Sequence, residues 1–142
     1  MNILVSACLL GIPCRYDGTG AECRELSALV GRHSLVPVCP EQLGGLPTPR
    51  QPAEICRGQV VTRDGADVTR AFQKGAELAL SIAKRLDCTH AILKRNSPSC
   101  GHGHIYDGSF SGVKTPGDGL TAKMLMDNGI AVSGEDSLGT FL

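Results

Sequence analysis

An apolar run, Asn2-Ile3-Leu4-Val5-Ser6-Ala7, leads directly to Cys8 and then into a loop that contains Gly11 and Pro13. A run this short and this apolar is typical of a strand that is buried on both faces of a parallel sheet. Three further runs of this kind follow, at about residues 34–39, 89–94 and 130–133. These runs predict four strands of one sheet.

Helical periodicity occupies the segments between the strands. The clearest helix is expected at about residues 68–86, where Phe72, Ala76 and Ala79 recur at helical spacing and Asp67 is a suitable N-cap. Shorter helices are expected at about residues 21–31 and 120–128 and close to the C-terminus. Strands that alternate with helices predict an α/β fold, a single small three-layer domain over residues 1–142 with a mostly parallel, Rossmann-like sheet.

Two long loops are expected at the carboxyl edge of this sheet, over residues 40–66 and 95–118. Loops of this length inside a compact domain are uncommon and usually functional. The first contains a hairpin predicted at about residues 59–68, with Asp64-Gly65 as its turn, and the second contains a hairpin around Asp107-Gly108. Because ligands bind at the carboxyl ends of the strands in open α/β sheets, we expect the functional site there.

Composition narrows the class of protein. The formal net charge is zero and the aromatic content is 4% with no Trp, so little favours binding of nucleic acid. The apolar runs are too short for a membrane span, and the first residues lack the basic segment and cleavage site of a signal peptide. We therefore expect a cytoplasmic protein with neither a nucleic-acid nor a membrane partner.

Four of the seven cysteines, Cys8, Cys14, Cys39 and Cys100, lie at or just beyond strand ends in loops with Gly and Pro. A disulfide framework is not expected in a cytosolic chain. Thiolates gathered at one edge of the sheet could instead hold a soft metal or an iron–sulfur cluster. We therefore predict a metal site made of these four residues. The other cysteines, Cys23, Cys56 and Cys88, are expected to pack as small apolar side chains.

Polar residues next to these cysteines are candidates for chemistry. Glu41 follows Cys39 closely, and it is either a turn cap or, beside a metal, a general base. Ser97 and Ser99 flank a proline, and they either form the turn or present a hydroxyl that orients water or substrate.

Cationic and aromatic residues could shape a pocket around the thiols. Arg15, Tyr16 and Asp17 directly follow Cys14, and they either line a pocket or form a surface turn. Arg50 lies in the Pro-rich loop and could close over a ligand. Lys94 and Arg95, at the end of the third strand, could favour bound anions or be ordinary surface residues, and the sequence leaves both alternatives open.

Five segments contain most of these candidates. They are Ser6-Ala7-Cys8-Leu9-Leu10-Gly11, Cys14-Arg15-Tyr16-Asp17-Gly18, Cys39-Pro40-Glu41, Gly44-Gly45-Leu46-Pro47-Thr48-Pro49-Arg50 and Ser97-Pro98-Ser99-Cys100-Gly101. Together they resemble the bacterial thiouracil desulfidase family, the domain family of unknown function 523. The resemblance covers essentially the whole chain, and the combination of motifs is specific to that family.

The resemblance implies an enzyme with a [4Fe-4S] cluster that only three cysteines hold. The fourth iron is open and takes the sulfur of a thiolated pyrimidine, and such a cluster is expected to be lost in air. Of the four candidates, Cys8 and Cys100 are the firmest ligands, while Cys14 and Cys39 compete for the third position.

The resemblance further implies that Glu41 and Ser97 are the acid and the hydroxyl that act beside the open iron. The expected reaction converts the thiocarbonyl of a small thiouracil-like base to a carbonyl and releases sulfide without net electron transfer. The remaining pocket residues, expected to contact the substrate, are Arg15, Tyr16, Asp17, Arg50 and Ser99.

Two other functions stay open at the level of the sequence. In one, the cysteines hold zinc in a non-catalytic binding domain. In the other, one reactive thiol carries a persulfide and transfers sulfur. The natural substrate and the oligomeric state are not predicted.

Overall fold

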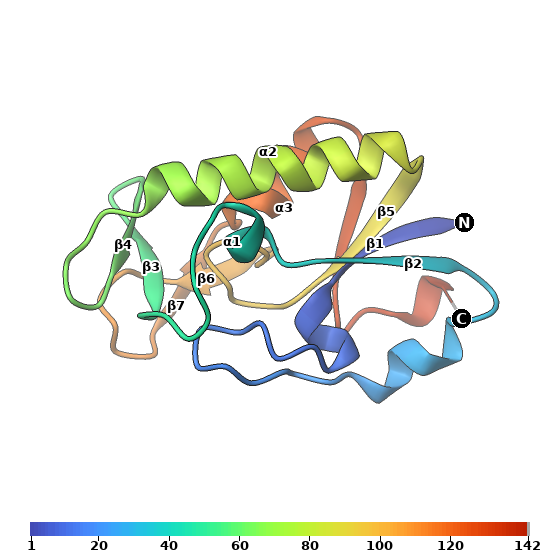
Figure 1. Ribbon diagram of the computed structural model, residues 1–142, viewed down its shortest axis with the longest axis horizontal. Helices are drawn as coiled ribbons and strands as arrows, with labels where there is room; N and C mark the ends of the chain where they lie inside the picture. The colour runs from blue at the N-terminus through green and yellow to red at the C-terminus, as the bar shows by residue number, and fades with distance from the viewer. Residues whose placement is uncertain (142) are drawn as a thin grey trace.

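A four-stranded parallel sheet lies at the centre of the computed structural model, which describes residues 1–141 (Figure 1). Its strands are β1 (Asn2–Ser6), β2 (Ser34–Val38), β5 (Cys88–Leu93) and β8 (Ala131–Gly134). The strand order is β2-β1-β5-β8, and every neighbouring pair is parallel. The four predicted strands and the Rossmann-like parallel sheet are therefore confirmed.

Two α-helices, α2 (Thr69–Arg85) and α3 (Leu120–Asp127), cover one face of the sheet (Figure 1). Leu4 of β1 packs on this side in one buried cluster with Ala79 of α2 and Leu125 of α3. The predicted N-cap of α2 is displaced by one residue: Val68 occupies the cap position, and the Asp67 carboxylate accepts the N–H of Thr69 at 2.9 Å. Among residues 1–141, no helix is both long and apolar enough to cross a membrane.

Short 3₁₀ helices cover the opposite face. They are η1 (Ala7–Leu10), η2 (Arg24–Ala28) and η3 (Gly139–Phe141). Ile3 and Val5, which alternate with Leu4 along β1, form the second buried cluster with Leu26 and Leu29. The sheet is thus buried on both faces, as a parallel sheet requires, and the three-layer architecture is confirmed.

The helix predicted over residues 21–31 is wrong, because only η2 forms there. The backbone N–H groups of Ala21 and Cys23 donate to the carbonyls of Cys8 and Leu9, both at 2.8 Å. These bonds hold the segment extended against η1 and prevent a longer helix. A single 3₁₀ turn is enough to direct both apolar anchors of this segment inward.

Two hairpins lie beyond the carboxyl ends of the strands, at the end of the molecule opposite the two termini (Figure 1). They are β3 (Ala53–Cys56) with β4 (Gln59–Thr62), and β6 (His104–Tyr106) with β7 (Lys114–Pro116). The β6–β7 hairpin is the one predicted around Asp107-Gly108, and both long loops lie at the predicted edge.

The predicted hairpin over residues 59–68 has the wrong partner. β4 pairs with the preceding strand β3, and the turn between them is Arg57-Gly58, with φ angles of 52° and 78°. Positive φ at both central residues is the requirement of a tight hairpin turn. Asp64-Gly65 forms a turn as well, but only an isolated bridge from Val61 to Asp67 follows it.

The one-turn helix α1 (Pro40–Leu43) packs directly on α2. Glycines allow the backbones to approach: a Cβ on Gly75 would lie 1.9 Å from the Pro40 carbonyl oxygen, and one on Gly44 would lie 2.0 Å from that of Ala71. No other residue type fits at such distances. This contact fixes α1, which follows Cys39 and carries Glu41, against the longest helix of the fold.

Candidate active site

The chain reverses its direction across the sheet between β1 and β5. It passes from β1 to β2 on one side and returns to place β5 on the other side. In open α/β sheets, the crevice at such a switch point is where ligands bind. A cavity of about 340 Å³ lies there, walled by the ends of β1, β2 and β5, by α1 and by residues of both hairpins.

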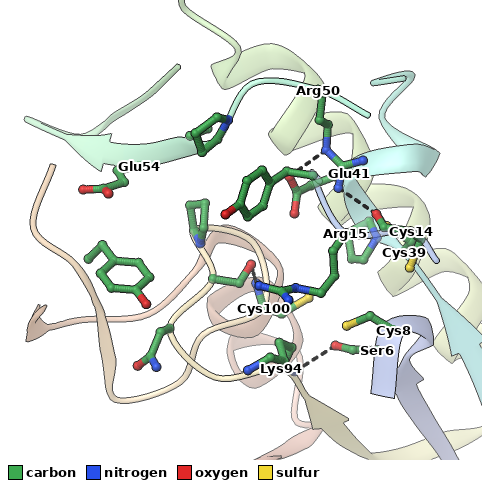
Figure 2. Close-up of a pocket in the computed structure, with 18 of the residues that line it drawn as sticks. Ser6, Cys8, Cys14, Arg15, Cys39, Glu41, Arg50, Glu54, Lys94 and Cys100 are labelled. Atoms are coloured by element: carbon green, nitrogen blue, oxygen red, sulfur yellow. Dashed lines mark hydrogen bonds and ion pairs between the residues drawn. The ribbon is translucent and has the colours of Figure 1, made fainter. Parts of the chain in front are cut away.

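All four predicted cysteines line this cavity (Figure 2). Cys8 lies in η1 directly after β1, Cys39 precedes α1, and Cys14 and Cys100 come from the loops after η1 and β5. Cys8, Cys14 and Cys100 are buried and Cys39 is half-buried. All seven cysteines of the chain are free thiols, and Cys88 is buried, as expected of a packing residue.

Burial controls the protonation of these thiols. It raises the pKa of Cys8 to about 11, against the opposing effect of Lys94, and the pKa of Cys14 to about 12. Burial also raises the pKa of Cys100, which the nearby Ser6 hydroxyl lowers in part. The neighbouring Cys39 adds to the rise in all three. These thiols are therefore neutral at neutral pH, and a metal that binds them must displace their protons.

The chemistry of the donor set fits an iron–sulfur cluster. Cys39 shifts the pKa of each of the other three thiols, and Cys8 does so for Cys14 and Cys100, so the four thiols from separate segments of the chain surround one space. Among the described residues, no group of three or more His, Cys, Asp or Glu side chains is placed to hold a single metal ion. Thiolates that bind different irons of a cluster do not have to converge on one point.

Glu41 lies beside the thiols on α1. Its Oε1 accepts a hydrogen bond from Nε of Arg50 at 3.2 Å, and Oε2 has no partner among the described residues. Burial raises the pKa of the Glu41 carboxyl, although Arg50 opposes the rise. Figure 2 shows Glu41 directed toward the same space as the labelled cysteines. Glu41 therefore lies in the same cavity as the four cysteines.

The Arg50 guanidinium is hydrogen-bonded mainly to other groups of the protein. Its guanidinium donates to Glu41, to the carbonyl oxygen of Cys14 at 2.9 Å, to Thr48 Oγ1 at 2.8 Å and to the Pro47 carbonyl oxygen at 3.2 Å. The side chain is 6% exposed. Arg50 therefore lines the cavity but mainly ties Glu41 to the Cys14 loop, whereas it was predicted to contact substrate.

The two predicted serines differ in placement. Ser97 lines the cavity, and its Oγ accepts the N–H groups of Ser99 and Cys100, both at 3.0 Å. A hydroxyl with both acceptor positions used retains its own hydrogen to donate. Ser99 is 1% exposed, shares a 2.9 Å hydrogen bond with Thr121 of α3, and does not line the cavity.

The residues that follow Cys14 also differ in whether they line the cavity. Arg15 and Tyr16 line the cavity, with the guanidinium carbon 5.8 Å from the centre of the Tyr16 ring. Asp17 lies outside it, where its carboxylate accepts both the backbone N–H and the hydroxyl of Thr19. Asp17 thus stabilises the turn that presents its two neighbours.

Other cavity residues were not predicted as site residues. The two hairpins contribute Glu54, Arg63, Tyr106 and Phe110. The only signal in the sequence was that their loops would lie at this edge, since no motif marks the individual residues. Lys94 also lines the cavity, where it forms a 2.9 Å ion pair with Glu135.

Comparisons with known proteins identify the family of this chain. The family model described as 2-thiouracil desulfurase matches residues 3–137. The chain belongs to this family. It is 45% identical over 150 residues to YbbK, an uncharacterized protein of Bacillus subtilis (strain 168), with 99% of each chain covered.

A solved structure described as the [4Fe-4S]-dependent thiouracil desulfidase TudS is also similar to the chain. It shares 48% sequence identity and a TM-score of 0.93, over 99% of this chain and 94% of that one. The expected family and α/β fold are confirmed. Neither comparison supports the zinc-binding or persulfide alternatives for this member of the desulfurase family.

Proposed function

We propose that this chain is a [4Fe-4S]-dependent enzyme that converts a thiolated pyrimidine such as thiouracil to its oxo base and releases sulfide. The observation that carries the proposal is one cavity in which buried thiols, the Glu41 carboxylate and the Ser97 hydroxyl meet. The family match and the similarity to TudS support the same reaction. Water supplies the oxygen, sulfur leaves as hydrosulfide, and no net electron transfer is needed.

Three of the cysteines would hold the cluster. Cys8 and Cys39 directly follow β1 and β2, and Cys100 lies in the loop after β5, so these thiols come from three neighbouring strands. Cys14 belongs to the same β1–β2 connection as Cys8. We therefore assign Cys8, Cys39 and Cys100 as ligands and leave Cys14 as the neighbouring free thiol. When bound, the cluster supplies a soft Lewis acid that takes the thiocarbonyl sulfur and makes its carbon more electrophilic.

Glu41 would act as general base. Arg50 occupies one carboxylate oxygen, and the second can accept a proton from a water molecule in the cavity. Ser97 can donate its remaining hydrogen to orient that water, because its two acceptor positions are filled by backbone N–H groups. A positioned base of this kind contributes about 10²–10⁴-fold to rate.

The remaining cavity walls would hold the thiolated pyrimidine. Arg15 and Tyr16 close the cavity on one side, while Arg50 fixes Glu41 rather than the substrate. Asp17 and Ser99 would support the walls from outside the cavity. The partner is a small thiolated base, and a nucleic-acid substrate stays disfavoured by the zero net charge.

We further propose a cytoplasmic location. All seven cysteines are free, which fits a reducing compartment, so we place the enzyme in the cytoplasm. We treat residues 1–142 as a single functional unit, since the family model and the cavity residues both span most of the chain.

The test is turnover of thiouracil by anaerobically reconstituted protein. Equal amounts of uracil and sulfide should form, and the oxygen of the new carbonyl should come from isotopically labelled water. Glu41→Gln should keep the cluster absorbance and lose about 10²-fold or more in kcat. Glu77→Gln, a change on the exposed face of α2, is the matched control and should be as active as the wild type. A fully loaded wild type without turnover would refute the proposal.

A further inference from the structure

Glu54 is a buried carboxylate that the proposed reaction does not use. It lies in β3, is 9% exposed and lines the cavity. Figure 2 shows it on the side of the cavity away from the labelled cysteines. A buried carboxylate normally needs hydrogen-bond donors to remain stable. The donors to Glu54 indicate what this side chain does.

Both donors belong to the β6–β7 loop, residues 107–113. Glu54 Oε1 accepts the backbone N–H of Gly108 at 3.0 Å and that of Phe110 at 3.1 Å. A carboxylate that accepts two backbone N–H groups forms strong, charge-assisted hydrogen bonds. One side chain of the first hairpin therefore holds the tip of the second.

The loop needs such an anchor because its backbone is unusual. Phe110 has a φ of +56°, in the left-handed region that bulky residues rarely adopt, and Gly108 has a φ of +92°. The loop also sits tightly on β3, since a Cβ on Gly108 would lie 2.7 Å from the carbonyl oxygen of Ile55. Backbone in this region persists only where surrounding contacts over-determine it.

The anchored loop delivers an aromatic ring to the cavity. Phe110 is half-buried and lines the cavity, and the guanidinium carbon of Arg63 lies 5.8 Å from the centre of its ring. Tyr106, at the end of β6, lines the same cavity. Aromatic faces bind planar bases by stacking. A pyrimidine whose sulfur faces the cysteines would extend toward this wall.

We propose that Glu54 is a positioning residue for substrate binding, which fixes the β6–β7 loop so that Phe110 forms the ring-stacking wall of the cavity. The inference rests on the proposed desulfuration of a planar thiolated base. The hairpins would then bind the ring, while the cysteines and α1 would face the reacting atoms.

The test combines Glu54→Ala, Phe110→Ala and the double variant, each loaded with cluster and assayed with thiouracil. Each single change should raise KM about tenfold, the effect of removing one stacking contact, and leave kcat within about twofold. The double variant should show little further rise, because Glu54 acts through Phe110. Glu54→Gln keeps an oxygen that accepts both N–H groups and should restore KM nearly to the wild-type value.

Controls separate this role from a merely structural one. Cluster absorbance should be unchanged in every variant, and Glu77→Ala on the exposed face of α2 should have the wild-type KM. If Glu54→Ala does not fold, Glu54→Asp replaces it. This change shortens the side chain by one methylene, moves the carboxylate away from the two N–H groups and should raise KM in the same way. An unchanged KM in the folded Glu54 variant would overturn this inference but not the proposed function. A double variant whose fold increase in KM equals the product of the two single fold increases would do the same. A wild type that neither binds nor converts thiouracil would overturn the proposed function as well.

Discussion

Arg50 shows how one side chain can organise this site. Its guanidinium contacts four separate acceptors, of which Glu41 and the Cys14 carbonyl belong to different segments that line the cavity. Arginine suits this task because its donors have a fixed planar geometry and remain charged. Glu41 is thereby held in one orientation, with one oxygen left for the cavity.

Replacing Arg50 with Gln should lower the free energy of unfolding by about 3–5 kcal/mol, because Glu41 would remain largely buried without its cationic partner. Urea denaturation of the wild type and the variant measures the difference. Arg85→Gln, at the exposed end of α2, should change it by less than about 0.5 kcal/mol. Equal effects of the two changes would show that the Arg50 contacts do not stabilise the fold.

At the scale of the elements, α1 depends on α2. A helix of one turn is not stable by itself, so its place is set by the packing of its backbone on Gly75. Cys39 and Glu41, which flank the start of this turn, are therefore positioned by a residue far from them in the sequence.

Gly75→Ala should force α1 away from α2, since the added Cβ would lie 1.9 Å from the Pro40 carbonyl oxygen. We expect a loss of about 1–3 kcal/mol in unfolding free energy, as for other overpacked sites, and a lower kcat because Glu41 moves. Thermal unfolding and steady-state kinetics measure the two effects. Ser81→Ala, on the exposed surface of the same helix, is the control and should alter neither quantity. A Gly75→Ala enzyme with wild-type kcat would contradict the role of this contact.

The elements that could be predicted from the sequence are those with a strong local pattern. The four strands and α2 were predicted because burial on both faces and helical spacing are visible in a short window. The helix at residues 21–31 was wrong, because long-range hydrogen bonds to η1 override a weak local preference. The first hairpin was misplaced because Arg57-Gly58 lacks the Asn or Asp that usually marks such a turn.

Only the side of the candidate site that carries the cysteines could be predicted from the sequence. Cys8, Cys39 and Cys100 lie at strand ends, which a topology argument brings together. Glu54 accepts the backbone N–H groups of Gly108 and Phe110 from a separate hairpin, and nothing in either local sequence indicates that pairing. Asp17 and Ser99 lie in the predicted motifs but outside the cavity, where Asp17 holds a turn and Ser99 is hydrogen-bonded to Thr121 of α3.

At the scale of the whole molecule, the proposed cluster would join segments that are distant along the chain. Cys8 follows β1, Cys39 follows β2 and Cys100 lies in the loop after β5, so one bound group would connect the segments that follow three strands. A group that binds only the folded state stabilises it by mass action. The cluster should therefore contribute to stability as well as to chemistry.

Removing the cluster with an oxidant and a chelator should lower the Tm by about 5 °C or more relative to the loaded protein. Calorimetry under anaerobic conditions measures the shift, and reconstitution should reverse it. Cys56→Ser, outside the cavity, should show the same shift as the wild type. Identical Tm values for loaded and stripped protein would contradict a stabilising cluster held by the three strand ends.

The most direct test of the account is the iron and acid-labile sulfide content of anaerobically reconstituted protein, measured for the wild type and four single Cys→Ser variants. The account predicts about four irons and four sulfides per chain in the wild type and in Cys14→Ser, with the cluster lost or much reduced in the Cys8, Cys39 and Cys100 variants. Wild-type protein without iron and sulfide, or variants that all retain the full content, would contradict a [4Fe-4S] cluster held by these three cysteines.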